Sequence, residues 1–335
     1  SSDLLGQTFY EYDRREEHFH FLEWLKQQIK QHEIDVLLIA GDVFDSPNPS
    51  AESQRVYYRF LREVTSENPS LQIVIIAGNH DSAARLEAPN PLLEDMNIIV
   101  RGTVRRNAEG DIDLQHFIVP LYTEGKVTAY CLAVPYLRQG DYPSAENYSK
   151  GVQQLYEQLF NKVKEKGIPV VVMGHLQATG SEISEDDRSE RTVIGGLECV
   201  SPDAFNEAIT YTALGHLHRS QRVSHRENVR YSGTPMPMSF AEKNNASGVV
   251  MITIDTEGTN IEKLEFQPLA GLVSIPPEAR PLEEVLQVIG ELPDGDVTLR
   301  SPYLEIKILM TEPEPSYKYK IEEALKGKAV RLARI

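Results

Sequence analysis

Four short apolar runs in this chain each end in a polar signature that contains glycine, and this repeated pattern limits the possible folds most strongly. The runs are residues 36–40, 73–77, 170–173 and 209–214, and the signatures are Gly41-Asp42-Val43-Phe44-Asp45, Gly78-Asn79-His80-Asp81, Gly174-His175 and Gly215-His216-Leu217-His218. Short β-branched runs without polar alternation are typical of strands buried on both faces, as in parallel sheets. Because ligands of open α/β sheets bind beyond the carboxyl ends of the strands, we expect the four signatures to meet at one sheet edge.

The side chains in these signatures are those of a hard-metal site. They offer carboxylate, amide oxygen and imidazole but no thiolate, which suits Mn²⁺, Fe or Zn²⁺. A glycine before each ligand lets the backbone turn sharply and approach an ion closely. Two ions about 3.5–4 Å apart can activate a water and hold both the attacking and the leaving oxygen of a phosphate ester. Hydrolysis of a phosphate ester is therefore the leading reaction class.

Each signature alone has a plainer interpretation. Gly-Asp after a strand is often only a turn, and Gly-His is often a loop or core histidine. His216 and His218 stand at positions i and i+2, so in an extended segment they would point to the same side and could hold adjacent ions. The occurrence of all four signatures in order, each after an apolar run, favours the metal site.

These residues resemble the calcineurin-like metallophosphoesterases, whose blocks are D-x-H, G-D-x-x-D, G-N-H-D/E, G-H and G-H-x-H. Four of the five blocks are present in this order. Longer strings narrow the resemblance to the SbcD family of bacterial double-strand-break repair nuclease subunits, over residues 2 to about 270. The strings are Leu5-Gly6-Gln7-Thr8-Phe9-Tyr10, Ala40-Gly41-Asp42-Val43-Phe44-Asp45, Ala77-Gly78-Asn79-His80-Asp81-Ser82, Ala213-Leu214-Gly215-His216-Leu217-His218-Arg219 and Tyr231-Ser232-Gly233-Thr234-Pro235.

The resemblance implies a role for each residue of the signatures. Asp42 would bridge two metal ions. One ion would be bound by Asn79, His175 and His216, and the other by His218. His80 would face the scissile phosphate instead of a metal ion, and Asp45 would orient it, since a carboxylate partner fixes the imidazole tautomer and raises its basicity. From the residues alone, Asp45 could equally form an N-cap or Asx-turn before a helix that starts near Ser50, and the two roles are compatible.

The first block is where the sequence departs from the family. The chain opens Ser1-Ser2-Asp3-Leu4-Leu5-Gly6, without a preceding strand and without a histidine. Leu4 falls on the histidine position, and Asp3 falls on the aspartate position if a gap of one residue is allowed. The first metal would then depend on Asp42, His218 and Asp3. Either upstream residues are missing or the site is naturally degenerate; the lack of an initiator Met favours the former, so we expect the parent protein to carry the block.

Length and composition limit the number of domains, the possibility of a membrane span and the redox compartment. A length of 335 residues predicts about two domains. No apolar run approaches the roughly 18 residues of a membrane span. The two cysteines, Cys131 and Cys199, lie in apolar, strand-like stretches, so we expect buried free thiols in a protein of the reducing cytoplasm.

The formal net charge of −16 argues against strong binding to DNA, because basic residues that release counterions drive such binding. Arginines nevertheless cluster after two of the expected strands. The candidate DNA contacts are Arg101, Arg105, Arg106, Arg219 and Arg222. The alternative is that they line a solvated hairpin face. A partner that supplies further DNA contacts would fit this charge balance.

Periodicity predicts the remaining elements of the larger domain. We expect helices at residues 15–31, 50–64, 83–93 and 148–166, and strands at 98–100, 117–121, 128–134, 192–195, 248–255 and 263–267. Residues 182–190 form a dense acidic stretch, which we expect to be an exposed loop without a catalytic role. In the resembled family, helices at 50–64 and 83–93 would pair with their symmetry mates in a homodimer; simple packing on the sheet is the alternative.

The character of the chain changes at about Gly271. Pro276-Pro277 and Pro281 indicate a linker, followed by a helix at 282–292, a strand at 303–309, a helix at 317–325 and a strand at 329–335. We therefore predict a two-sheet αββα metallophosphoesterase sandwich at residues 1–270 and a small α/β cap at 271–335. The resemblance implies that the cap lies over the active site and helps to admit DNA ends. It also implies that family members continue, past the last residue of this sequence, into helices that bind the coiled-coil ATPase SbcC.

The resemblance implies a Mn²⁺-dependent DNA exonuclease or endonuclease that acts on double-stranded ends and hairpins with two divalent ions, Fe, Zn²⁺ or Mg²⁺ being alternatives to Mn²⁺. Its partners would be DNA, SbcC and a second copy of the chain, without a membrane. One alternative is a phosphatase or small-molecule phosphodiesterase with the same metals. Another is a non-catalytic scaffold that binds DNA ends and whose first metal site is degenerate.

Overall fold

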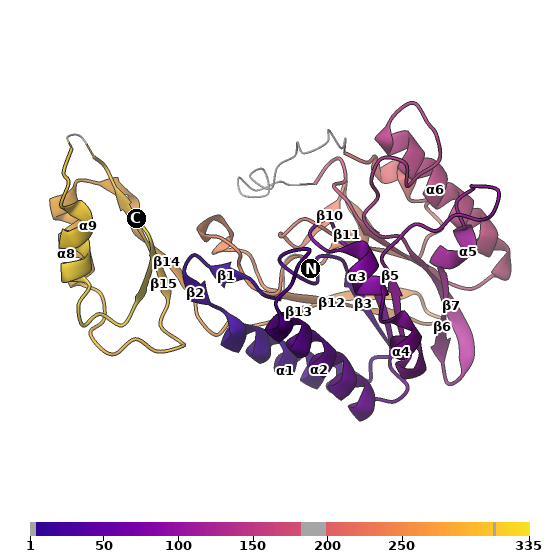
Figure 1. Ribbon diagram of the computed structural model, residues 1–335, viewed down its shortest axis with the longest axis horizontal. Helices are drawn as coiled ribbons and strands as arrows, with labels where there is room; N and C mark the ends of the chain where they lie inside the picture. Colours follow the sequence, from indigo (N-terminus) through magenta and orange to yellow (C-terminus); the bar gives the residue numbers. More distant parts are fainter. Residues whose placement is uncertain (1–4, 182–198, 311–312) are drawn as a thin grey trace.

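Two sheets face each other in the larger part of the molecule. The computed structural model describes residues 5–181, 199–310 and 313–335. The first sheet is parallel and has the order β3 (Val36–Ala40), β4 (Gln72–Ile76) and β5 (Ile98–Arg101), with Val36 paired to Gln72 and Ile73 to Ile98. Helices α1 (Arg15–Gln31) and α2 (Ala51–Glu67) cover its outer face (Figure 1). These elements lie close to where the apolar runs and helical periodicity predict them.

The second sheet is longer and mixed. Its order within the described residues is β10-β11-β9-β8-β7-β6, and β7, β8, β9 and β11 run parallel. The strands are β6 (Ile118–Thr123), β7 (Lys126–Ala133), β8 (Val170–His175), β9 (Tyr211–Gly215), β10 (Gln221–Val223) and β11 (Arg226–Tyr231). Helix α6 (Tyr148–Val163) covers the outer face, with Leu155, Tyr156 and Leu159 at most 1% exposed.

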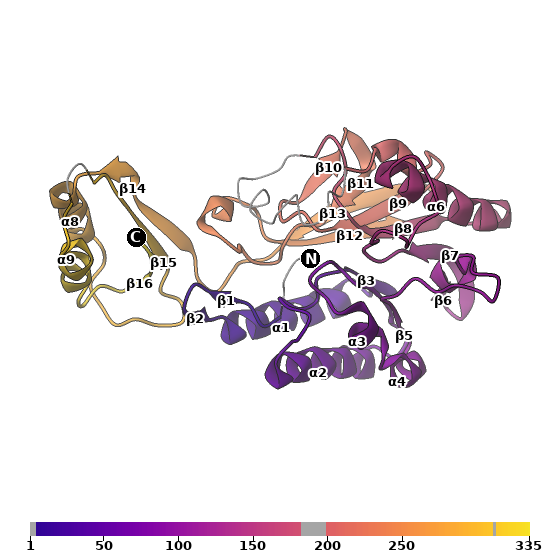
Figure 2. The ribbon, with the colours of Figure 1, turned by 45° about the horizontal axis from the view of Figure 1, so that its top comes forward.

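The inner faces of the two sheets form a common core. Val74 and Ile76 of the first sheet pack with Cys131, Ala133 and Met173 of the second, and each of these side chains is fully buried. Small and β-branched residues dominate the contact, so the strands of both sheets are covered on both sides. The result is the predicted αββα sandwich, seen from its side in Figure 2.

Local signals explain where the long helices begin. Ser50 Oγ accepts a hydrogen bond from the amide of Ser53 at the start of α2, and Asn147 Oδ1 accepts one from Lys150 at the start of α6. Such caps satisfy amides that have no partner within the helix. The expected helix at 83–93 is instead two short helices, α3 (Ala83–Glu87) and α4 (Asn90–Leu93). The break coincides with Pro89, the N-cap of α4, because proline supplies no amide for the preceding turn.

The remaining short elements connect the main ones. They are β1 (Thr8–Phe9), β2 (Tyr12–Asp13), α5 (Leu114–Phe117), the hairpin β12 (Gly248–Ile254) and β13 (Thr259–Glu265), and the 3₁₀ turns η1 (Glu94–Met96), η2 (Lys164–Lys166), η3 (Pro202–Ala204) and η4 (Phe240–Glu242). Within the described residues, no strand pairs with the outer edge of β3.

The C-terminal part has a sheet and a core of its own. It contains β14 (Leu272–Arg280), α8 (Leu282–Gly290), β15 (Tyr303–Ile308), α9 (Tyr317–Ala324) and β16 (Arg331–Arg334), with all three strands parallel. Val285, Ile289, Leu304, Ile306 and Ile321 form its centre. Both views place it beside β1 and β2, at the opposite end of the molecule from β6 and β7 (Figures 1 and 2).

Two expectations were wrong in detail. The segment with Pro276 and Pro277 is not a linker but strand β14, whose pairing with β15 shifts register between Ile275 and Arg280. Prolines are tolerated there because they interrupt the ladder only at this irregularity. Cys131 is buried as predicted, whereas Cys199 is exposed.

Two further expectations, the acidic loop at 182–190 and the strand at 192–195, lie outside the described residues. Among the helices that the structure does describe, none combines the length and apolarity that crossing a membrane requires.

Candidate metal centre

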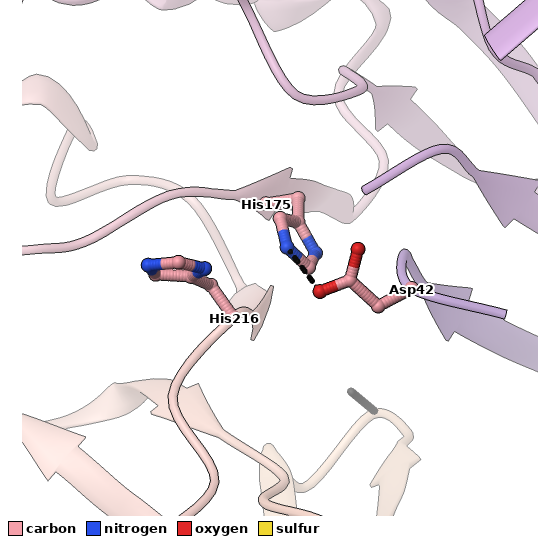
Figure 3. A group of neighbouring side chains, drawn as sticks. All are labelled: Asp42, His175 and His216. Atoms are coloured by element: carbon pink, nitrogen blue, oxygen red, sulfur yellow. Dashed lines mark ion pairs between the residues drawn. The ribbon is translucent and has the colours of Figure 1, made fainter. Parts of the chain in front are cut away.

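Polar residues from four strand ends meet between the two sheets. Asp42 follows β3, Asn79 follows β4, His175 ends β8 and His216 follows β9. Ligand atoms of Asp42, His175 and His216 all lie within 4.8 Å of one another, and Figure 3 shows the His175 ring facing the Asp42 carboxylate, with the His216 side chain beside this pair. The structure therefore brings together the residues that the sequence assigns to one metal ion.

Asp42 is the central carboxylate of this cluster. It is 1% exposed; its Oδ2 lies 3.0 Å from His175 Nε2 and its Oδ1 accepts a hydrogen bond of 3.0 Å from the amide of His80. Its backbone has a φ of 48°, and that of His216 has a φ of 101°. Positive φ values are uncommon for residues other than glycine and are concentrated at functional sites.

The second nitrogen of His175 fixes the orientation of its ring. Nδ1 lies 2.8 Å from the carbonyl oxygen of Ala40, and a carbonyl can only accept, so Nδ1 carries the hydrogen. In the neutral ring Nε2 is then the atom with the free electron pair. Metal-binding histidines are usually held by such a hydrogen bond from the other nitrogen.

Asn79 contacts both imidazoles. Its Oδ1 lies 2.9 Å from His175 Nε2 and 3.2 Å from His216 Nδ1. Carboxylate oxygen, amide oxygen and two imidazole nitrogens thus surround one point. This set of oxygen and nitrogen ligands fits a divalent cation such as Mn²⁺, Fe or Zn²⁺.

Electrostatics at the cluster favour the charged forms. Burial alone would raise the pKa of the Asp42 carboxyl, but the imidazoles of His175 and His80 and the hydrogen bonds to Asp42 bring its pKa well below the usual range. Burial alone would lower the pKa of His175, but the Asp42 carboxylate raises it. The site therefore carries a buried negative charge that attracts positive charge, from a proton or from a metal ion.

Glycine is required at positions 41 and 78, because the backbone there lies very close to proposed metal ligands. Gly41 has a φ of 86°, and a Cβ there would collide with the His175 ring; a Cβ at Gly78 would collide with the Asp42 carboxylate. Any other residue at these positions would have to displace a ligand. The glycines of the signatures thus permit the four strand ends to converge.

His218 has a buried carboxylate partner that does not belong to this group. The three residues whose ligand atoms gather within 4.8 Å do not include it, and the segment from His216 to His218 is not extended, because β9 ends at Gly215 and His216 has a positive φ. The segment is therefore not the extended one that the spacing suggested, and the side to which His218 points relative to His216 stays a prediction. His218 is 4% exposed, and its Nδ1 lies 2.7 Å from Oε1 of Glu242, which is fully buried.

The other residues predicted for catalysis and metal binding have less defined settings. His80 is half-buried, beside Asp42 through its amide, and Asp45 is exposed, with its amide donating to the carbonyl of Leu5. Asp3 lies outside the described residues.

The candidate DNA-binding arginines are largely engaged within the chain. Arg101 Nε donates to the His116 carbonyl at 2.5 Å, Arg105 pairs with Glu87 at 2.5 Å, and Arg106 donates to the carbonyls of Gly110 and Gly140 at 2.6 and 2.5 Å. Arg222 pairs with Glu227. Arg219 is exposed directly after His218.

Sequence reasoning assigned no role to two residues of the site. Asp81, 2% exposed, accepts hydrogen bonds from the amides of Val43, Phe44 and Gly78, and burial raises the pKa of its carboxyl, helped by Asp42. Its place in the Gly-Asn-His-Asp signature could have indicated it. Glu242 follows His218 by 24 positions and belongs to none of the signatures, so no local pattern indicates it.

Comparison with known proteins places the chain among described families. Residues 2–220 match the family described as calcineurin-like phosphoesterase, and residues 266–335 match the family described as type 5 capsule protein repressor C-terminal domain. The chain is 34% identical to the SbcD subunit of the nuclease SbcCD from Rhodobacter capsulatus, over 98% of this chain and 84% of that protein. It is 30% identical to the same subunit from Escherichia coli K12, over 80% and 68%, and 28% identical to that from Bacillus subtilis, over 74% and 63%.

Proposed function

We propose that this chain, which belongs to the calcineurin-like phosphoesterase family and within it is an SbcD-like nuclease, hydrolyses DNA phosphodiesters by a two-metal mechanism. The observation that carries the proposal is the convergence of Asp42, Asn79, His175 and His216 from four strand ends. A metal-dependent phosphodiesterase needs such a set of oxygen and nitrogen ligands at one point.

Divalent ions bound here would supply positive charge that lowers the pKa of a water molecule and neutralises a phosphate oxygen. We assign one ion to Asp42, Asn79, His175 and His216, and the other ion to His218 with Asp42. Mn²⁺ is the ion that we propose, as the resemblance to the SbcD family implies, and the oxygen and nitrogen donor set suits it as well as it suits Fe or Zn²⁺. Asp3 remains a proposed further ligand.

The residues around the metal ligands have separate tasks in this proposal. The Ala40 carbonyl accepts a hydrogen bond from Nδ1 of His175, which leaves Nε2 as the nitrogen that would bind the ion. Asp42 Oδ1 accepts a hydrogen bond from the amide of His80, and we propose that the imidazole of His80 faces the scissile phosphate. We propose that the imidazole of His80 protonates the leaving oxygen and that Asp45 orients it.

The names of the relatives suggest partners for this chain. The name of the relatives describes one subunit of a complex, SbcCD, and we propose DNA ends and SbcC as partners of this chain. Arg219 is the proposed DNA contact with the clearest exposure; Arg105, Arg106 and Arg222 are secondary, and the donors of Arg101 are turned to carbonyls within the chain. A homodimer, a cytoplasmic location and a domain boundary at residue 270 remain predictions.

Cleavage assays with three substrates test the function. The full chain should release nucleotides from double-stranded DNA ends when Mn²⁺ is added and should lose this activity with a chelator. Hydrolysis of a phosphopeptide or a cyclic nucleotide at a higher kcat/KM than DNA would overturn the nuclease assignment in favour of a phosphatase or small phosphodiesterase. Absence of any hydrolysis, with a single bound ion, would favour the non-catalytic scaffold.

A further inference from the structure

His218 and Glu242 form a buried pair beside the metal site. Nδ1 of His218 lies 2.7 Å from Oε1 of Glu242, and the two side chains are 4% and 0% exposed. The second carboxylate oxygen, Oε2, accepts a hydrogen bond of 2.8 Å from the amide of Met238. Glu242 is thus fixed at both oxygens.

This contact determines which nitrogen of His218 can bind a metal ion. An ionised carboxylate only accepts hydrogen bonds, so Nδ1 of His218 must be the donor. In the neutral ring the free electron pair is then on Nε2. Without Glu242 the ring could exchange tautomers and rotate, and partners of this kind typically contribute 10- to 100-fold to metal affinity.

The segment that carries Glu242, residues 237–242, is anchored at its other end. The carbonyl oxygen of Pro237 accepts a hydrogen bond of 2.7 Å from Arg14 Nη1. The ring of Phe240 packs against Phe9 and Tyr10, with centroids 5.4 and 5.8 Å apart. The position of Glu242 therefore depends on residues of β1 and on Arg14, just before α1.

The same residues hold the C-terminal part of the molecule. Arg14 forms a buried ion pair of 2.8 Å with Glu17, and Glu17 Oε1 lies 2.5 Å from the hydroxyl of Tyr303 in β15. Arg331 of β16 donates to the same hydroxyl at 3.0 Å. The ring of Tyr303 packs on Phe9 with centroids 4.7 Å apart. One buried junction thus supports both the C-terminal sheet and the segment of Glu242.

We propose that Glu242 is the positioning residue of His218. We further propose that the junction around Tyr303 keeps Glu242 in place. Metal binding at His218 then depends on the docking of the C-terminal part, through Tyr303, Phe9, Phe240 and Glu242. The proposal rests on the proposed function, in which His218 binds one of two ions. The new element is that the affinity for that ion depends on how the C-terminal part packs against the rest of the chain.

Imidazole ¹⁵N NMR of the metal-free full chain tests the first step. The resonances of His218 are identified by their loss in His218→Asn. In the wild-type chain we expect a single tautomer with the hydrogen on Nδ1, and in Glu242→Gln a mixture of tautomers. Glu262→Gln, at an exposed position of β13, is the matched control and should leave the spectrum unchanged. An unchanged His218 tautomer in Glu242→Gln would overturn the positioning role.

Calorimetric titration with Mn²⁺ tests the second step. Glu242→Gln should weaken one of the two binding events about 10- to 100-fold and spare the other. Tyr303→Phe, which keeps the ring but removes the hydroxyl between Glu17 and Arg331, should weaken the same event by a smaller factor. Tyr319→Phe, at a side chain 64% exposed on α9, should change neither.

The outcomes separate the two hypotheses. A wild-type chain that binds no Mn²⁺ refutes the proposed function, whatever the state of His218. A wild-type chain that binds two ions, with the same affinities in Glu242→Gln, refutes the inference and leaves the function intact. Loss of affinity in Glu242→Gln but not in Tyr303→Phe refutes the link to the C-terminal part.

Discussion

The buried carboxylate of Asp81 accepts a hydrogen bond of 3.1 Å from the backbone amide of Val43. The two residues belong to different signatures, one after β3 and one after β4. Asp81 also accepts from Phe44 at 3.1 Å and from Gly78 at 2.9 Å. One side chain outside the proposed ligand set thus ties together the turns that carry Asp42 and Asn79.

Replacing Asp81 should therefore damage both stability and the metal site. Asp81→Ala leaves three buried amides without an acceptor, and we expect a loss of about 3 kcal/mol or more in the free energy of unfolding. Asp81→Asn retains one acceptor oxygen and should lose less. Urea unfolding and Mn²⁺ titration of the same samples check this. A stable Asp81→Ala chain with wild-type metal affinity would contradict the role of Asp81 as a tie between the turns.

The extent to which this site could be predicted depends on how local its signals are. Asp42, Asn79, His175 and His216 follow apolar runs directly, so the strand, the turn and the ligand can all be read from consecutive residues. Parallel pairing then brings the strand ends together. The sandwich and the grouping of these four side chains follow from the same pattern, although the residues are far apart in the chain.

Other features depend on long-range contacts and backbone details that no local sequence pattern indicates. Glu242 reaches His218 only because Phe240 and Arg14 hold its segment. The proline pair of β14 favours a linker because prolines usually interrupt sheets, yet Pro276 and Pro277 fall where the ladder is already irregular. The positive φ of His216 likewise ends the extended run before His218, and spacing alone cannot indicate such a turn.

A methyl group at Gly78 should displace the central carboxylate. The Cβ of Gly78→Ala would collide with the side chain and the amide of Asp42, so Asp42 must move away from His175. We expect Mn²⁺ affinity to fall by at least tenfold, as measured by calorimetry. Gly290→Ala, at the end of α8 where a Cβ meets only open space, is the matched control and should keep wild-type affinity. Equal affinities in the two variants would show that the approach of Gly78 to Asp42 is not needed.

His175 should be indispensable for metal binding. His175→Asn removes the imidazole that Asp42 and Asn79 both contact, and a buried carboxylate without that partner is strained electrostatically. We expect loss of one of the two Mn²⁺ binding events and a lower melting temperature without metal. His225→Asn serves as the control, because His225 is exposed in a turn with a φ of 62° that Asn adopts readily. Two binding events with wild-type affinities in His175→Asn would remove His175 from the ligand set.

His80 should separate catalysis from metal binding. In the proposed mechanism its imidazole protonates the leaving oxygen and binds no ion, so His80→Gln should keep both metal affinities. DNA cleavage should fall about 10²- to 10⁴-fold, the usual contribution of a general acid. Metal content by elemental analysis and single-turnover cleavage are the two measurements. A variant that loses metal in parallel with activity would make His80 a ligand instead.

The pH dependence of stability should contain a contribution from His18 in α1. This side chain is 3% exposed, and its Nε2 has no hydrogen-bond partner among the residues that the structure describes. Burial, together with the nearby Arg14, lowers the pKa of His18 to about 4 from 6.5. As the pH falls, His18 therefore binds its proton at a lower pH in the folded chain than in the unfolded chain.

The sign of the effect follows from this order of protonation. Above pH 6.5 His18 is neutral in both states and contributes nothing. Between 6.5 and about 4 the unfolded state binds more protons, so the free energy of unfolding falls with decreasing pH, by roughly 3 kcal/mol at most. His18→Gln has no such proton, so urea unfolding at pH 7.5, 6 and 5 should show a shallower decline than in the wild type. His225→Asn, at an exposed site, should follow the wild-type slope; an equal slope in His18→Gln would mean that His18 is already protonated in the folded chain.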